Sequence, residues 1–170
     1  KKELEFYRHW YYNAIRSVIG ICKFKDDYQG LAESCTPNIT EKEARDAVKL
    51  LADLNMISTD RDGYWKGNDT FVSTAGNWRS QAVRAFQHET IRLADESLDR
   101  HQPFLRDIST VTMTFCMDDI QLLREKINAF REDLLRLSQE GTDDDTVFQL
   151  NIQMFPLAFT KPLKEKEKEK

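Results

Sequence analysis

Residues 40–66 read TEKEARDAVKLLADLNMISTDRDGYWK, and this stretch contains the signals that decide the fold. Thr40 and Glu43 form a capping-box pair, because the threonine hydroxyl accepts the amide hydrogen of residue 43 while the glutamate carboxylate returns to the amide of residue 40. Asp62-Gly63 supplies the positive backbone angles of a tight hairpin turn. The residues between them repeat apolar side chains at the spacing of one helix face. These are Ala44, Ala47, Val48, Leu51 and Leu54. The stretch therefore predicts a helix followed by a β-hairpin.

The preceding residues extend this pattern to that of a winged helix. From about residue 3 to residue 24, apolar residues recur at spacings of three and four, which predicts one long helix. Asp26 or Asp27 can cap a short second helix, and Thr36-Pro37-Asn38 interrupts the chain after it. Helix, short helix, helix and hairpin is the order of a winged helix. We assign residues 1–76 to a winged-helix-like module that ends in a polar, glycine-bearing joint.

The second module, residues 77–160, changes its hydrophobic period along the chain. A long helix is predicted from about residue 77 to residue 100. Alternating apolar and polar residues then predict strands at 111–115 and 148–154. The helix between them begins near Asp118, ends at Gly141 and carries a strict three-four apolar stripe. The stripe consists of Ile120, Leu123, Ile127, Phe130, Leu134 and Leu137.

A strand, a helix and a second strand predict a right-handed β-α-β unit with parallel strands. The expected fold class is therefore α+β, with a winged-helix-like N-terminal half followed by a helix and a β-α-β unit. Two strands are too few for a stable sheet, since three or more are normally needed. A second subunit can supply them, which predicts a homodimer through the second half. The competing interpretation is that the wing hairpin or the first helix covers the sheet edge within one chain.

Composition places the protein among globular proteins. The 170 residues are 40% hydrophobic and 32% charged, a balance that supports a core. We expect a cytoplasmic protein with no membrane partner, because no apolar run approaches the roughly 18 residues of a membrane span and the first residues lack the core of a secretory signal. Cys22, Cys35 and Cys116 are expected to be buried, reduced thiols. The tail, residues 161–170, is expected to be a solvated charged end.

The common catalytic motifs are missing from the sequence. The chain has no Gly-x-Ser-x-Gly elbow, P-loop or dinucleotide fingerprint. His88-Glu89 lacks the second histidine of a metalloprotease helix, since Arg92 stands at that place. Asp118 and Asp119 are explained by capping of a helix rather than by catalysis. The sequence therefore predicts a non-enzymatic protein with no catalytic, cofactor or metal site, an unrecognised enzyme being the least favoured alternative.

Direct DNA binding is the alternative that the winged helix raises. The formal net charge is −4, and the predicted third helix exposes as many acids as bases. We therefore favour a module that docks other protein parts, with DNA contacted indirectly. If the winged helix does bind DNA, the candidate residues are Lys42, Arg45, Lys49, Arg61 and Lys66.

The aromatic first helix is a candidate interface. Trp10 and Tyr11 lie on its apolar stripe and Tyr12 lies beside it. Because tyrosine and tryptophan are favoured interface anchors, we expect part of this cluster to stay exposed for another domain or subunit.

Several stretches resemble a bacterial paralogous family assigned to transcription regulation, in which a Cro/repressor-type helix-turn-helix is followed by a C-terminal domain of uncharacterised function. The matching stretches are residues 11–16, 39–57, 93–100 and 106–109, and the closing QLNIQMFPL at 149–157, which is the most specific. The resemblance is to the C-terminal domain, and it implies that a fused N-terminal helix-turn-helix domain, absent from this chain, contacts DNA. The chain opens without methionine, which agrees with such a preceding segment. The resemblance implies no catalytic residues.

The combined expectation is a non-enzymatic regulatory domain of a bacterial transcription regulator. It mediates dimerisation or effector response for the fused DNA-binding domain. The alternative is a winged helix that binds DNA directly.

Overall fold

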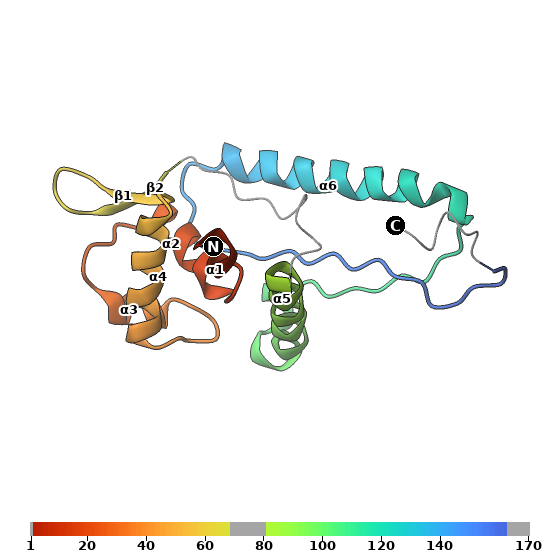
Figure 1. Cartoon of the computed structure of the whole chain (residues 1–170), viewed down its shortest axis with the longest axis horizontal. Helices are drawn as coiled ribbons and strands as arrows, with labels where there is room; N and C mark the ends of the chain where they lie inside the picture. Colours follow the sequence, from red (N-terminus) through yellow and green to blue (C-terminus); the bar gives the residue numbers. More distant parts are fainter. Residues whose placement is uncertain (1, 69–80, 163–170) are drawn as a thin grey trace.

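The computed structural model describes residues 2–68 and 81–162, and it confirms the α+β class (Figure 1). The first half contains, in chain order, α1 (Lys2–Phe6), α2 (Tyr11–Ile21), α3 (Tyr28–Glu33), α4 (Glu41–Asp53), β1 (Ile57–Thr59) and β2 (Trp65–Gly67). The second half contains α5 (Gln81–Arg100), a short 3-10 turn at Pro103–Leu105, another at Met117–Asp119, and α6 (Ile120–Glu140). The expected joint falls mostly, and the charged tail almost wholly, outside the described residues.

The capping box and the hairpin turn that the sequence predicts are both present in the structure. The amide of Thr40 donates to Glu43 Oε2 at 2.8 Å and the amide of Glu43 donates to Thr40 Oγ1 at 3.2 Å, which confirms the capping box at the start of α4. In the wing, β1 and β2 pair antiparallel and Gly63 has a φ of 82°. The amide of Trp65 also donates to the carbonyl of Phe24 at 2.8 Å. The chain after α2 therefore adds a third extended segment to the hairpin.

The single long helix predicted for residues 3–24 is wrong, because the chain breaks between α1 and α2. Glu89 of α5 accepts the amide hydrogen of Trp10 at 2.7 Å, next to the first turn of α2. A carboxylate at this position satisfies an amide that has no partner in the helix and interacts favourably with the helix dipole. The break allows Phe6 and Ile15 to be fully buried in the same core.

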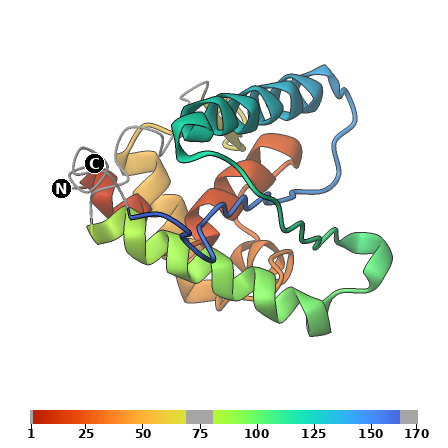
Figure 2. The same cartoon turned by 90° about the vertical axis from the view of Figure 1, so that its right-hand side faces the viewer.

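The hydrophobic core lies in the first half and includes the start of α5. Its largest fully buried side chains are Phe6, Ile15, Leu51, Ile57 and Val83. Val83 belongs to α5, and the ring of Phe86 meets Tyr7 edge-on at 6.0 Å between centroids. The start of α5 therefore packs on the winged-helix half, and the rest of the helix leads away from this core (Figure 2).

The β-α-β unit is formed only in part. Its helix is α6, but the segments 111–115 and 148–154 are extended without pairing as strands, and the sheet of the described chain consists of β1 and β2. Figures 1 and 2 show both segments running in the same direction, as expected of parallel strands. A strand needs a partner in register, and neither segment meets one among residues 2–68 and 81–162. The predicted strands are therefore wrong for the isolated chain.

None of the helices in the described ranges has both the length and the apolar character that crossing a bilayer requires.

Candidate interaction surface

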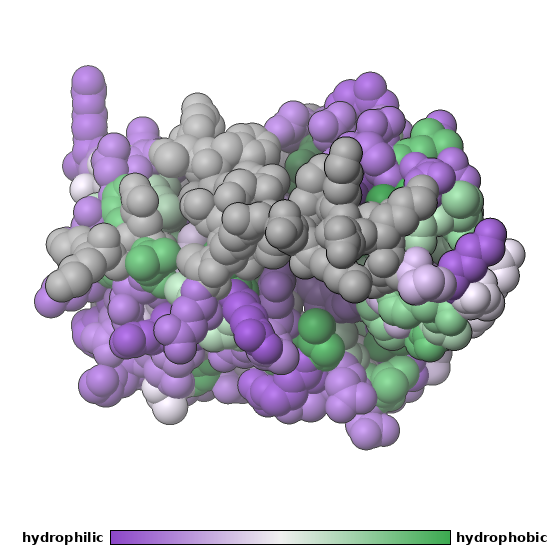
Figure 3. Space-filling view, turned by 45° about the vertical axis from the view of Figure 1, so that its right-hand side comes forward, coloured by the Kyte–Doolittle hydropathy of each residue, from purple (hydrophilic) through white to green (hydrophobic). Residues whose placement is uncertain are grey.

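The second half exposes a large apolar surface, formed by α6 and by residues 104–117 and 147–159, which are mostly extended. None of the residues from 102 to 162 is buried. Phe148 is 75% exposed, Val111 is 73% exposed and Phe130, in the middle of α6, is 52% exposed. We call this the second-half apolar surface. Figure 3 shows hydrophobic residues gathered at the right-hand end of the face that it draws. Contiguous apolar surface of this kind is typical of a binding site.

The extended segments have exposed side chains, and their backbone is unpaired among the described residues. Within the described residues, neither 107–115 nor 146–154 takes part in a backbone–backbone hydrogen bond. Asn151 is held on α5, where its side-chain amide donates to the carbonyl of Thr90 at 2.8 Å. Rows of unpaired amides and carbonyls act as templates for pairing with another strand. The segments are therefore candidate sites for strand addition.

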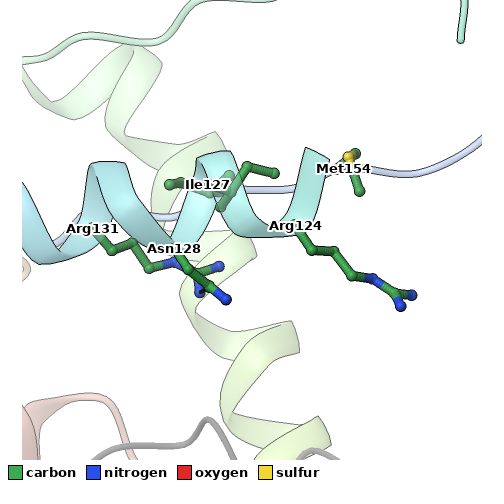
Figure 4. A pocket seen from close by; sticks show the side chains of 6 residues that line it. Arg124, Ile127, Asn128, Arg131 and Met154 are labelled. Atoms are coloured by element: carbon green, nitrogen blue, oxygen red, sulfur yellow. Dashed lines mark hydrogen bonds between the residues drawn. The ribbon is translucent and has the colours of Figure 1, made fainter. Parts of the chain in front are cut away.

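A small open hollow of about 270 Å³ lies between α6 and the segment 148–154. Figure 4 shows Arg124, Asn128 and Arg131 leaving the same side of α6. Arg131 donates to Asn128 Oδ1 at 3.1 Å, and Ile127, Ile152 and Met154 complete the lining. Guanidinium groups bind carboxylate and phosphate oxygens well, but these side chains are exposed, which weakens such a contact. The hollow belongs to the second-half apolar surface and supplies its polar part.

The candidate DNA-binding residues lie on two elements of the winged helix. Lys42, Arg45 and Lys49 share one face of α4, while Arg61 and Lys66 stand on the hairpin that follows it. Two of these bases contact acids on their own helix. Lys42 Nζ lies 3.0 Å from Asp46 Oδ2, and Arg45 lies 2.6 Å from Glu41 Oε1. The Arg45 guanidinium also stacks 4.1 Å from the centre of the Tyr28 ring.

The aromatic cluster is core rather than interface at two of its three positions. Tyr11 and Tyr12 are buried, and their rings pack edge-on at 4.9 Å. Burial raises the pKa of both hydroxyls above the usual value for tyrosine. The expectation that these two residues supply exposed surface is wrong, because both rings belong to the core cluster and α4 packs against α2. Trp10 remains partly exposed.

The three cysteines differ in burial, which corrects the expectation that all are buried. Cys35 is buried, and burial raises the pKa of its thiol to about 11. Cys22 and Cys116 are exposed, although partial burial raises the pKa of the Cys22 thiol. The reason is position: Cys22 follows the last turn of α2, and Cys116 lies beside the second-half apolar surface.

The histidines join separate elements of the fold. His9 Nδ1 lies 3.7 Å from Glu89 Oε1, so the glutamate that caps α2 also faces an imidazole. His101 Nε2 lies 3.0 Å from the hydroxyl of Thr36, which links the end of α5 to the loop after α3. The described residues contain no group of three or more potential metal ligands.

Sequence reasoning identified the extended segments and the stripe of α6, but it did not identify their exposure. It also missed Glu89, whose role depends on a residue 79 positions away, and the exposed Phe104, Phe155 and Leu157. The three exposed residues lie outside any periodic pattern, so no local signal marks them.

Comparison with known proteins gives one family match. The family model described as a domain of unknown function (DUF4423) matches residues 1–157. No curated protein and no solved structure matches the chain. The matched range contains the winged-helix half, α5, α6 and both extended segments.

Proposed function

The chain belongs to the DUF4423 family, and we propose that it is a non-enzymatic regulatory domain of a bacterial transcription regulator, acting by dimerisation or effector response. The observation that carries the proposal is the second-half apolar surface. Residues 102–162 form a helix and two extended segments without a buried side chain. Such a surface serves to bind another macromolecule.

The link to transcription is supported by the first half and by the resemblance of several stretches to transcription regulators. The helix order, capping box and wing turn of a winged helix are all present. In the proposed protein, a fused helix-turn-helix domain contacts DNA, and the present chain reaches DNA through it. Because repressor-type domains usually read paired half-sites as dimers, a binding surface in the regulatory domain suits this role.

Direct DNA binding by the winged helix is the second candidate function. Lys42, Arg45 and Lys49 lie on one face of α4, as a recognition helix requires. Glu41 and Asp46 weaken this candidate, because they neutralise two of the three bases and would face phosphates.

The test of the proposal is made with the natural gene that encodes this chain. The gene is deleted in its host and replaced by the wild-type allele, by Leu150→Asp or by Ile91→Asp, and transcript levels are measured. Leu150 is exposed on the second-half apolar surface and Ile91 is exposed on α5. We expect deletion to change a defined set of transcripts, which the wild type and Ile91→Asp restore and Leu150→Asp does not.

Immunoblots verify that the three proteins accumulate equally. A deletion that leaves all transcripts unchanged would contradict a regulatory role. Restoration by Leu150→Asp would show that the second-half apolar surface is not the functional one.

A further inference from the structure

We propose that the partner of the second-half apolar surface is a second copy of this chain, and that the segments 111–115 and 148–154 of the two copies pair into one shared sheet. The inference rests on the proposed function, which it makes specific by naming the partner. The resulting dimer is intertwined, with each copy supplying extended segments that the other completes.

Both segments have an unpaired backbone within the described residues. Both segments alternate apolar and polar residues, have extended backbones and make no backbone–backbone hydrogen bond within the described chain. Two strands are too few for a stable sheet, while two copies bring four. A two-fold axis then pairs the unpaired edge of one copy with the same edge of the other copy.

The two segments are also uncharged in composition. Neither 110–115 (TVTMTF) nor 148–154 (FQLNIQM) contains a charged residue. Proteins that prevent pairing at a strand edge commonly place lysine or another charge there. These edges have no such protection, and pairing between two identical uncharged edges meets no electrostatic repulsion. A partner recognised by charge does not fit them.

The apolar stripe of α6 is only partly covered in the single chain. Its six residues repeat at alternating spacings of three and four along the helix, yet Phe130 and Leu137 are more than half exposed. In the described chain, α6 makes no extensive contact with another helix or strand apart from the short turn that precedes it. A sheet formed by two copies offers an apolar face on which this stripe can pack.

The experiment measures the mass of the full chain by sedimentation over a dilution series, together with hydrogen–deuterium exchange. We expect twice the monomer mass of 20.0 kDa, with amides of both segments protected in the dimer and unprotected after dilution. Met113→Asp and Leu150→Asp place an acid at side chains that are 54% and 56% exposed in the single chain. Both variants should therefore fold, keep their circular dichroism spectrum and sediment as monomers.

Ile91→Asp is the matched control, since Ile91 is 45% exposed on α5, outside the segments, and this variant should stay dimeric. A wild-type chain that is monomeric throughout would overturn the inference, whether or not its segments are protected. A dimer that survives both Met113→Asp and Leu150→Asp, with unprotected segments, would also overturn it. These results concern the purified chain alone. If the chain is monomeric but still controls transcription, the effector role stands. If the chain dimerises but deletion of its gene changes no transcript, only the proposed function is contradicted.

Discussion

Thr40 and Glu43 show how single residues set the boundary of an element. Thr40 accepts the amide hydrogen of Glu43, and the Glu43 carboxylate accepts both the amide and the hydroxyl hydrogen of Thr40. These hydrogen bonds, the one from the Thr40 amide first, hold the pKa of the Glu43 carboxyl below its usual value. A carboxyl whose pKa is lowered by folding stabilises the folded state above its unfolded pKa, and this contribution is lost as the pH falls through the folded pKa.

We predict that Thr40→Ala lowers the free energy of unfolding by about 1 kcal/mol at neutral pH, because α4 loses its cap. The difference between variant and wild type should shrink as the pH falls below the usual glutamate range, about 4.3, where Glu43 becomes protonated in the variant. Urea unfolding followed by circular dichroism at several pH values measures both effects. Thr40→Ser keeps the hydroxyl, so its free energy of unfolding should stay close to that of the wild type. If Thr40→Ala is as stable as the wild type, the capping box does not stabilise α4.

At the scale of the element, α4 and α6 are both amphipathic helices but bury different amounts of their apolar faces. The α4 residues Ala44, Ala47, Val48 and Leu51 are all buried, because α2 and α3 pack on them. The described residues of α6 include none that is buried. The same periodicity therefore produces a core helix in one case and an exposed stripe in the other.

This contrast predicts opposite results from two truncations. Leu51→Ala should lower the stability of the first half by about 2 to 5 kcal/mol, because it leaves a cavity in the core. Phe130→Ala should leave that transition nearly unchanged, since its ring contributes no core contact in the single chain. Unfolding monitored by tryptophan fluorescence reports on Trp10 and Trp65, which pack against this core. A loss of stability in Phe130→Ala as large as in Leu51→Ala would show that α6 packs on the first half.

The charges of α4 lead to a prediction about DNA. The wild-type chain should bind duplex DNA weakly and without sequence preference, because acids pair with Lys42 and Arg45. Glu41→Gln frees Arg45 and removes a charge that would repel phosphates, so its affinity should rise several-fold, with a steeper dependence on salt. Fluorescence anisotropy with two unrelated duplexes measures this.

The matched control for the DNA experiment is Asp133→Asn, which removes the acid from a comparable exposed pair with Arg136 on α6. It should leave DNA binding unchanged if binding occurs at the winged helix. Tight, sequence-specific binding by the wild type that Arg45→Ala abolishes would instead establish the winged helix as a direct reader of DNA.

At the scale of the whole molecule, the chain has a well-packed first half and an open second half. The core extends from α1 to the start of α5, and the described residues 102–162 add no buried side chain to it. In the described chain, the hydrogen bond from Asn151 to Thr90 ties the segment 148–154 to α5, and the start of α5 packs on the core of the first half. Stability of the second half is therefore expected to depend on association.

Only folded chains associate into the dimer. Mass action then predicts that the melting temperature of the wild-type chain rises with protein concentration. Calorimetry at several concentrations measures this dependence. Leu150→Asp should show a melting temperature that does not change with concentration. A wild-type melting temperature that is independent of concentration would speak against a dimer that stabilises the fold.

The sequence by itself determined α3, α4, the wing turn and α6, because capping residues, glycine in a tight turn and the period of apolar side chains act within a few positions. It also located the two alternating segments that form much of the candidate surface. The tertiary structure decided the break between α1 and α2, where Glu89 reaches Trp10. It likewise decided that Tyr11 and Tyr12 are buried and that 111–115 and 148–154 have no strand partner in the part of the chain that the structure describes. The alternation of apolar and polar residues indicates that a segment has an apolar face. What covers that face depends on contacts between residues far apart in the sequence, and these contacts have no local signature.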